Sequence, residues 1–406
     1  MERKLPLGTY PIVRLLQWFI RLQMIIPRLL LSVAVLTVAA SLLHAAPPRM
    51  TVLHHAVVND TIVDAQTPVG LVKDVSDGSL VLAFQDKGDV VAGTVTHYVR
   101  STDGGKSWSK PFASYKDPDP KVGAGVGFTQ LPDGRIIAVI MEVEHTDISA
   151  EGFKAPRKSR TVIADFDPQT ATLKPMTKLP QPPDSLVGAM PTNIVRLKNR
   201  DLILPAYLIP MDSAKPTPGV VYGSGLYRSR DDGRTWDQFE LVFAKREDRP
   251  EIFYNESVIF EKADGTLVAF ARYDNETPPA KRFMGKAVSQ DAGKTWTAPI
   301  DSDIPAICPV PLGRGDGSYL MFAGALDERL PRTNILYWST DGETFTKLGQ
   351  PYYSRTGGNP WNTATGGSQV ISPLGDDKYL ISFYAADKDL KGRDKTYVDS
   401  NIVEVK

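Results

Sequence analysis

The chain has 406 residues, of which 42% are apolar and 23% charged, as is usual for a globular protein with a sizeable core. Its formal net charge is zero, so no basic surplus indicates nucleic-acid binding and no acidic block indicates disorder. The single cysteine, Cys308, excludes an internal disulfide framework and a cysteine-rich metal site.

The N-terminal segment is typical of a targeting signal. An uncharged apolar run spans residues 29–43, with Arg28 before it and small residues after it. The run is shorter than the roughly 20 residues that a membrane-spanning helix needs. We therefore expect residues 1–46 to be a signal peptide, cleaved after Ala45 or Ala46, and the mature protein, 47–406, to be secreted or periplasmic. Retention of the segment as an anchor is the alternative.

Six segments after residue 50 share one pattern, in which an apolar stretch, a turn and a β-rich apolar run follow one another. The segments are 71–84, 127–140, 193–206, 257–272, 310–324 and 370–384, and their turns recur at steps of 52 to 66 residues. Asp-Gly between two apolar runs favours a hairpin, because glycine accepts a positive φ. An all-β unit of about 60 residues is typical of a propeller blade. The sequence thus predicts an all-β fold, a six-bladed β-propeller with four-stranded antiparallel blades.

A second motif, S-x-D-x-G-x-x-W, follows several of these units. It occurs at 101–108, 229–236 and 289–296, and in degraded form at 339–345. Its aspartate can accept backbone N–H bonds in a hairpin turn, its glycine takes the unusual φ, and its tryptophan packs under the blade. We expect Asp103, Asp231 and Asp291 to be structural and to lie on the outer rim. The final strand is expected to close the ring by pairing with the first blade.

This motif is the Asp-box, and through it residues 60 to 405 resemble the sialidase superfamily and its bacterial BNR-repeat relatives. In a propeller, ligands bind where side chains from successive blades converge at the axis. Only the fourth unit offers a charged residue at both ends of its hairpin, Glu256 and Arg272. The resemblance implies that Glu256 polarises the nucleophile and that Arg272 and Arg332 bind the carboxylate of an acidic sugar. A simple ion pair is the alternative role for Glu256 and Arg272.

The chain departs from the family pattern at two places. The family's first arginine belongs to an R-I-P motif, and Gln66–Pro68 reads Q-T-P at that position. The family's nucleophilic tyrosine opens the last blade, where this chain has Gly366–Ser368. Tyr353 and Tyr254 are the candidate substitutes, the latter because residues i and i+2 of a strand share a face, here with Glu256. Aromatic packing is the alternative role for both.

The family's acid/base aspartate lies between the first hairpin and the first Asp-box. Asp89 matches it best, with Asp86 second and His97 a weaker candidate base in the same segment; each is also compatible with an ordinary turn or strand position. Glu142 and Glu144 follow the second hairpin and are weaker candidates still. No histidine spacing indicates a metal site, and no phosphate-binding loop follows a strand. We expect no metal and no cofactor.

These observations favour an exported exo-glycosidase that removes terminal acidic sugars, with sialic acid implied by the resemblance. Glu256 and Asp89 would be catalytic, and Arg272 and Arg332 would bind substrate. One alternative is a propeller glycosidase or lyase that acts on another sugar, such as a different ulosonic acid, a uronic acid or a rhamnoside. The other is a non-catalytic glycan-binding propeller. The expected partner is a glycan or glycoconjugate, with no nucleic acid and no membrane span after signal cleavage.

Overall fold

The chain divides into two units, residues 1–47 and 48–406, and every described strand belongs to the second. The computed structural model describes residues 46–406 apart from 60, 63–66, 88–90, 146–155, 212–215, 245–251, 276–283, 303, 328–329, 352–363 and 389–393. The expected signal peptide, 1–46, therefore lies outside the described residues apart from its last residue.

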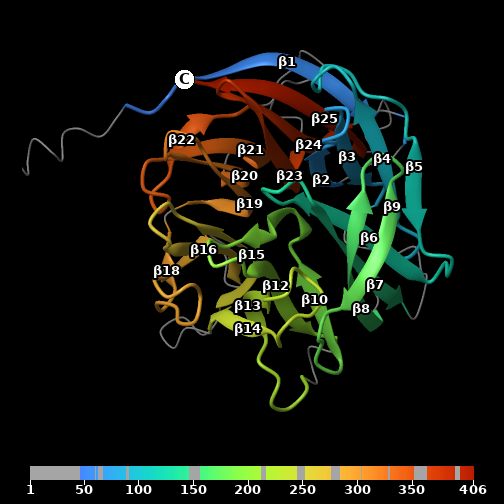
Figure 1. Cartoon of the computed structure of the whole chain (residues 1–406), viewed down its shortest axis with the longest axis vertical. Coiled ribbons are helices and arrows are strands. Elements are labelled where there is room, and N and C mark those ends of the chain that lie inside the picture. Colours follow the sequence, from blue (N-terminus) through green and yellow to red (C-terminus); the bar gives the residue numbers. More distant parts are fainter. Residues whose placement is uncertain are drawn as a thin grey trace, which may run out of the picture. The chain divides into compact units, whose positions relative to one another are not determined.

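Residues 48–406 form six antiparallel sheets, each a blade of the propeller (Figure 1). The first blade contains β2 (Thr67–Lys73), β3 (Leu80–Gln85), β4 (Val95–Ser101) and β5 (Ala113–Lys116). The second contains β6 (Val122–Gln130), β7 (Ile136–His145), β8 (Pro156–Asp167) and β9 (Thr172–Lys178). The third contains β10 (Ser185–Ala189), β11 (Val195–Arg196), β12 (Leu202–Pro210), β13 (Gly223–Ser229) and β14 (Glu240–Phe243).

The other three blades follow in chain order. The fourth contains β15 (Ile252–Glu261), β16 (Leu267–Asn275), β17 (Met284–Ser289) and β18 (Ile300–Asp301). The fifth contains β19 (Ala306–Gly313), β20 (Tyr319–Asp327), β21 (Leu330–Ser339) and β22 (Thr346–Gly349). The sixth contains β23 (Ala364–Gly375), β24 (Lys378–Lys388), β25 (Asp394–Val405) and β1 (Met50–Asn59). The predicted six-bladed propeller is confirmed.

All six predicted turns join the first and second strands of a blade. Glycine takes the positive φ in four of them, for example Gly265 at 89°, and Arg200 takes it in the third blade at 75°. The third blade also departs from the regular pattern, because the 3-10 helix η1 (Pro191–Asn193) separates β10 from β11. Proline lacks an N–H for the ladder, so the inner strand is interrupted where Pro191 stands.

The ring is closed by pairing between the two ends of the propeller. β1 runs antiparallel to β25, from Met50 opposite Val405 to Asn59 opposite Val398. The expectation that the final strand pairs with the first blade was wrong, because β25 lies between β24 and β1 as the third strand of the sixth blade. The N-terminal strand is thus the outer strand of the last blade, and this pairing covers the edge that β25 would otherwise expose.

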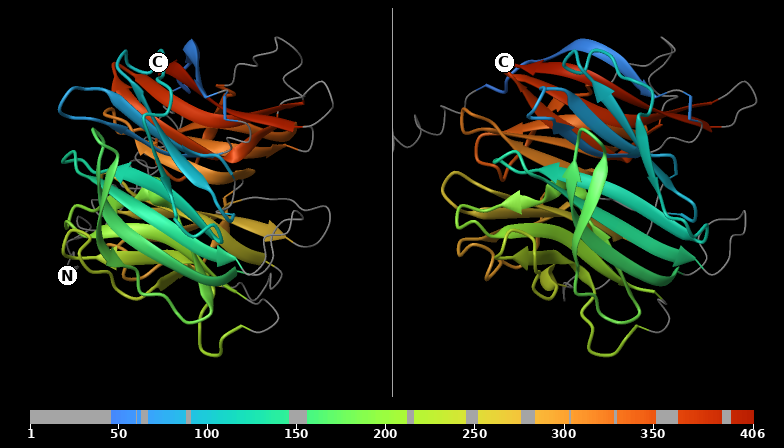
Figure 2. Two further views of the ribbon diagram at one scale, coloured as in Figure 1. Left: turned by 90° about the vertical axis from the view of Figure 1, so that its right-hand side faces the viewer. Right: turned by 45° about the vertical axis from the view of Figure 1, so that its right-hand side comes forward.

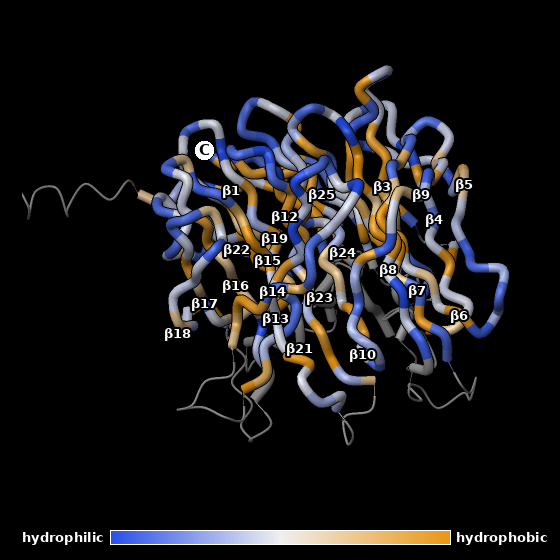
Figure 3. The backbone as a smooth tube through the Cα atoms, turned by 60° about the horizontal axis from the view of Figure 1, so that its bottom comes forward, coloured by the Kyte–Doolittle hydropathy of each residue, from blue (hydrophilic) through white to orange (hydrophobic). Residues whose placement is uncertain are grey.

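The hydrophobic core lies between neighbouring blades rather than inside one of them. One cluster joins the second and third blades through side chains such as Ile137 and Leu204, and another joins the fourth and fifth through Phe270 and Met321. Figure 2 shows the sheets stacked against one another, and in Figure 3 hydrophobic segments run along the strands whereas many turns are hydrophilic. Because each sheet buries both faces, the strands are apolar on both sides.

The Asp-boxes connect the third strand of a blade to its outermost strand. In the first box, Asp103 accepts backbone N–H bonds from Lys106 and Ser107, both at 3.0 Å, while Ser101 Oγ accepts from the Gly105 nitrogen at 2.8 Å. A Cβ on Gly105 would lie 2.8 Å from Leu380 of the sixth blade. The box is therefore a structural turn that packs against the preceding blade, at the opposite end of the strands from Glu256 and Arg272.

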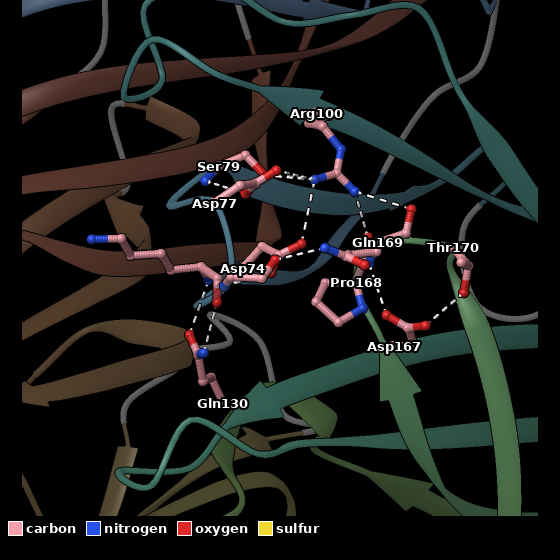
Figure 4. Close-up of polar contacts among 11 residues, drawn as sticks. Asp74, Asp77, Ser79, Arg100, Gln130, Asp167, Pro168, Gln169 and Thr170 are labelled. Atoms are coloured by element: carbon pink, nitrogen blue, oxygen red, sulfur yellow. Dashed lines mark hydrogen bonds and ion pairs between the residues drawn. The ribbon is translucent and has the colours of Figure 1, made fainter.

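Hydrogen bonds from arginine side chains to backbone carbonyls join neighbouring blades at this Asp-box end. Arg100 of β4 donates to Ser79 Oγ at 2.5 Å within its own blade and to the Pro168 carbonyl of the second blade at 2.6 Å (Figure 4). Arg228, at the corresponding position before the second Asp-box, donates to the Ala292 carbonyl of the next blade at 2.9 Å. An arginine has enough donors to serve two blades at once, which fixes their relative positions.

The Asp-box carboxylates should make stability depend on pH. A hydrogen bond from the Ser107 hydroxyl lowers the pKa of Asp103 to about 2, and one from the Thr235 hydroxyl does the same for Asp231. Since these folded pKa values lie below the unfolded value near 4, the unfolded chain binds protons first as the pH falls. Stability is therefore present above pH 4 and lost toward pH 2.

Replacing both residues in the variant Asp103→Asn/Asp231→Asn should reduce the slope of unfolding free energy against pH between about 4 and 2, measured by urea melts. Asp376→Asn removes a turn aspartate outside the boxes and serves as the matched control for the loss of a carboxylate. An unchanged slope in the double variant would contradict the structural role of the boxes.

Candidate functional site

Glu256 occupies a β-bulge near the start of β15, the inner strand of the fourth blade. Asn255 pairs with Arg272 and Ser257 with Ala271, so Glu256 is the extra residue between two ladder positions. Its φ is 33°, in the left-handed region that costs a non-glycine residue about 1–3 kcal/mol. Backbone strain of this kind concentrates at functional sites, and here it fixes the direction of a carboxylate.

Arg272, at the end of β16, lies beside this carboxylate. Its Nη1 is 2.9 Å from Glu256 Oε2, and the two side chains are 18% and 22% exposed. The predicted pair is therefore brought together, within one blade and at the end of the strands opposite the Asp-boxes. Both side chains are thus partly open to solvent, and the carboxylate can act as a base.

The fifth and sixth blades extend the site beyond this pair. Cys308 of β19 is also a bulge residue, with a φ of 45°, and its Sγ lies 2.9 Å from Glu256 Oε2. Gln369 of β23 donates from Nε2 to the Cys308 carbonyl and, at 3.3 Å, to the Phe322 carbonyl. The inner strands of three successive blades thus meet at one cluster, Glu256, Arg272, Cys308 and Gln369.

Cys308 and Gln369 were not predicted as site residues. The repeat comparison did place Cys308 at the same position of its blade as Glu256, nine residues before the turn. That shared position is the signal that could have found it, because both residues occupy the bulge of an inner strand. Gln369 carries no comparable signal, since its role depends on a carbonyl of the neighbouring blade.

Several predicted residues lie outside the part of the chain that the structure describes. Asp89 and Tyr353 belong to undescribed segments, and so does Gln66 of the Q-T-P sequence. Arg332 is part of β21, and Gly366–Ser368 is part of β23, but the side chains at these positions are not among those described. The roles given to Asp89 and Arg332 therefore remain predictions.

Tyr254 does not share the environment of Glu256. It is 2% exposed and packs against Phe243 and Tyr273, with ring centroids 5.1 and 5.8 Å away, in the core between the third and fourth blades. The interpretation of Tyr254 as a neighbour of Glu256 on one strand face was wrong, because the bulge at Glu256 breaks the alternation of side chains. Aromatic packing is the role that the structure supports.

The weaker candidates have ordinary structural contacts. Asp86 accepts the Val95 backbone N–H at 2.8 Å, and the His97 ring stacks on Phe84 with centroids 5.4 Å apart. Burial lowers the pKa of His97. Glu142 forms an ion pair with Arg160 of the neighbouring strand. These contacts favour turn and strand roles for all three.

The described part of the chain contains no group of three or more His, Cys, Asp or Glu residues arranged to hold a metal ion. A helix with the length and apolar character to cross a bilayer is likewise not found among the described residues.

A cavity of about 530 Å³ opens between the first and second blades, at the Asp-box end. Its lining includes Lys73, Asp74, Arg135 and Gln169, and Figure 4 shows part of this region. Arg135 is held by Asp165 at 2.8 Å and by the Asp232 carbonyl at 2.7 Å, while Gln169 donates to Ser76 at 2.7 Å. These groups already stabilise the blade boundary, so the cavity is a weaker candidate than the Glu256 cluster despite its volume.

Comparison with known families agrees with this arrangement. Residues 157–350 match the model of the BNR repeat-like domain, and residues 99–110, which contain the first Asp-box, match the BNR/Asp-box repeat. The propeller therefore contains BNR-type repeats over these residues. No curated protein is close enough in sequence to match it.

Solved structures resemble the propeller over most of its length. A protein of unknown function from Dyadobacter fermentans has a TM-score of 0.65 at 19% identity, covering 88% of this chain and 100% of that one. An α-L-arabinanase of Penicillium chrysogenum complexed with arabinobiose has 0.55 at 13%, covering 86% and 98%. The NanB sialidase of Streptococcus pneumoniae has 0.53 at 11%, covering 89% and 72%. At these identities the likeness concerns the fold.

The assignment of Tyr254 to the core makes a stability prediction. Tyr254→Ala should lower the unfolding free energy by about 3–5 kcal/mol, because the ring fills space against Phe243 and Gly285 between the blades. Phe253→Ala is the matched control, since the neighbouring ring is 36% exposed and its loss should cost far less. Urea melts measure both values. Equal losses would mean that Tyr254 is not a core residue.

Proposed function

We propose that this propeller is an exo-glycosidase that removes a terminal acidic sugar, sialic acid in the first instance, from a glycan. The observation that carries the proposal is the Glu256–Arg272 pair, partly exposed and held at a strained bulge at the end opposite the Asp-boxes. In this role Glu256 is the catalytic base that activates the nucleophile. Arg272, joined by Arg332, binds the sugar carboxylate, and Asp89 protonates the leaving oxygen.

An acidic sugar suits a guanidinium because the planar fork of arginine matches a carboxylate with two parallel hydrogen bonds. Arg272 directs Nη1 to Glu256, and guanidinium offers five N–H donors in all. In the proposal the same arginine contacts both Glu256 and the substrate carboxylate. The sugar carboxylate would then lie beside Glu256, the base that activates the nucleophile.

A neutral terminal sugar, such as an arabinoside, is the second candidate substrate. It is favoured because the charge of Arg272 is already balanced by Glu256, and because Gln66–Pro68 stands where sialidases have their first arginine. The Penicillium chrysogenum structure is a propeller of this fold complexed with arabinobiose. Hydrogen bonds between the protein and the hydroxyl groups of the sugar would then replace those between Arg272 and a sugar carboxylate.

The proposal includes export. The apolar run at 29–43 and the small residues after it are the features of a cleavable secretory signal. N-terminal sequencing of the protein recovered outside the cytoplasm should begin at residue 46 or 47. An N-terminus that retains residues 29–43 would favour the membrane anchor.

The test is a panel of aryl glycosides, including sialosides, Kdo-type glycosides and arabinofuranosides, assayed with the wild-type protein and two variants. Arg272→Lys keeps the charge but loses the fork, and losing one charge-assisted bond of about 1.5–3 kcal/mol lowers kcat/KM for an acidic sugar roughly ten- to hundredfold. Glu256→Gln should lower kcat, because a carboxamide cannot accept the proton of the nucleophile.

Matched controls come from the Asp-box end of the fourth and third blades. Glu261→Gln removes a carboxylate from β15, and Arg230→Lys changes an arginine in the second Asp-box; both should keep wild-type activity. The site variants should also melt within a few degrees of the wild type. A large loss of melting temperature in both would identify the pair as a structural salt bridge, and full activity in both would place catalysis elsewhere. Glycan-array binding without turnover would instead indicate a binding protein.

A further inference from the structure

The thiol of Cys308 is the feature of the cluster that the proposed roles do not use. Its Sγ lies 2.9 Å from Glu256 Oε2, so the thiol donates to the carboxylate that Arg272 also contacts. Cys308 is partly exposed, and as the only cysteine of the chain it cannot enter an intramolecular disulfide. A hydrogen-donating nucleophile thus already rests against the proposed base.

The backbone holds this thiol in place from two blades. Cys308 stands in the bulge between Ile307 and Val310, with a left-handed φ of 45°, and Gln369 of the sixth blade binds its carbonyl. Gln369 is 2% exposed, and its Oε1 has no hydrogen-bond partner among the described residues. A buried acceptor of this kind is ordinarily satisfied by a donor such as an ordered water.

We propose that Cys308 is the catalytic nucleophile of this propeller, in the place that a tyrosine has in sialidases. The inference rests on the proposed glycosidase function. Sγ attacks the anomeric carbon and an S–C bond forms as the glycosidic C–O bond breaks, while the thiol proton passes to Glu256 Oε2. With an activated aryl glycoside the leaving group departs as the phenolate and takes a proton from solvent.

Water then completes the reaction. It attacks the anomeric carbon of the thioglycoside and the S–C bond breaks. Glu256 returns its proton to the sulfur, and the proton of the attacking water passes to solvent, replacing the one that the phenolate took. The free sugar and the phenol are the products, and Cys308 returns to the thiol. A thiol serves as a nucleophile with less activation than a hydroxyl or phenol, so one carboxylate partner is sufficient.

Cys308 has one other role that fits its contacts, which is to position Glu256 through the S–H donor. Two substitutions separate the roles. Cys308→Ser keeps a donor to Glu256 but is a much weaker nucleophile, whereas Cys308→Ala removes both. A positioning residue is rescued by serine, and a nucleophile is not.

The experiment compares wild type, Cys308→Ser and Cys308→Ala on the aryl glycoside that the wild type hydrolyses best, with melting curves to verify folding. Both variants should lose kcat by about a thousandfold or more, as removal of a nucleophile does. A fluorinated glycosyl fluoride of the same sugar should add its mass to the wild-type protein, and peptide mapping should locate it on Cys308.

Each other outcome overturns the inference in a recognisable way. A label on another residue, or a Cys308→Ala variant within about tenfold of wild type, would exclude Cys308 as nucleophile while the glycosidase function stands. Activity in Cys308→Ser with none in Cys308→Ala would make Cys308 a positioning residue. A wild-type protein that hydrolyses no glycoside would overturn the proposed function, and the nucleophile with it.

Discussion

Closure of the ring by β1 and β25 is the constraint on which the rest of the structure depends. Each blade is apolar on both faces and buries them only against two neighbours, so an open ring would expose two sheets. Pairing of Met50 with Val405 at one end and Asn59 with Val398 at the other joins the N-terminal strand to the last blade. A side-chain contact also crosses the boundary between the first and sixth blades, where Trp108 of the first Asp-box donates to Ser400 at 3.0 Å.

Closure also determines how the inner strands are held. They belong to different sheets, so polar side chains connect them instead of ladder hydrogen bonds. Asn193 accepts the Ile259 backbone N–H at 2.7 Å, Thr129 accepts that of Ile194 at 3.1 Å, and Gln369 binds the Cys308 carbonyl. The candidate site is one of these connections, the one that includes a carboxylate, a guanidinium and a thiol. Its geometry therefore depends on the relative positions of three blades.

The two ends of the blades differ in the contacts that their polar side chains make. At the Asp-box end, arginines such as Arg100 and Arg228 serve two blades each and the box carboxylates are satisfied by local donors. At the other end, Glu256 and Cys308 stand at strained bulges and remain partly exposed. The interblade contacts of the Asp-boxes and the candidate site thus lie at opposite ends of the strands, as in other folds where rigid elements support a site at one edge.

Much of this fold could be predicted because its signals are local. Six turns and four Asp-boxes are short sequence patterns, and the fourth hairpin alone carried charges at both ends, which identified Glu256 and Arg272 as neighbours. The closing pair could not be inferred in the same way, since β1 precedes the first turn and belongs to a blade 300 residues later in the chain.

The bulges could not be predicted from the alternation of side chains along a strand. One extra residue at Glu256 moved Tyr254 into the core, and a second bulge brought Cys308 of another blade to the carboxylate. A contact between residues 52 positions apart has no local signature in the sequence.

We infer that the Glu256 cluster, rather than the cavity at the Asp-box end, binds the sugar. A crystal structure of the protein soaked with the monosaccharide that the proposed activity would release tests this directly. We expect the sugar ring in contact with Glu256, Arg272 and Cys308. A sugar bound only between the first and second blades beside Lys73 and Gln169, with the Glu256–Arg272 pair untouched, would contradict it.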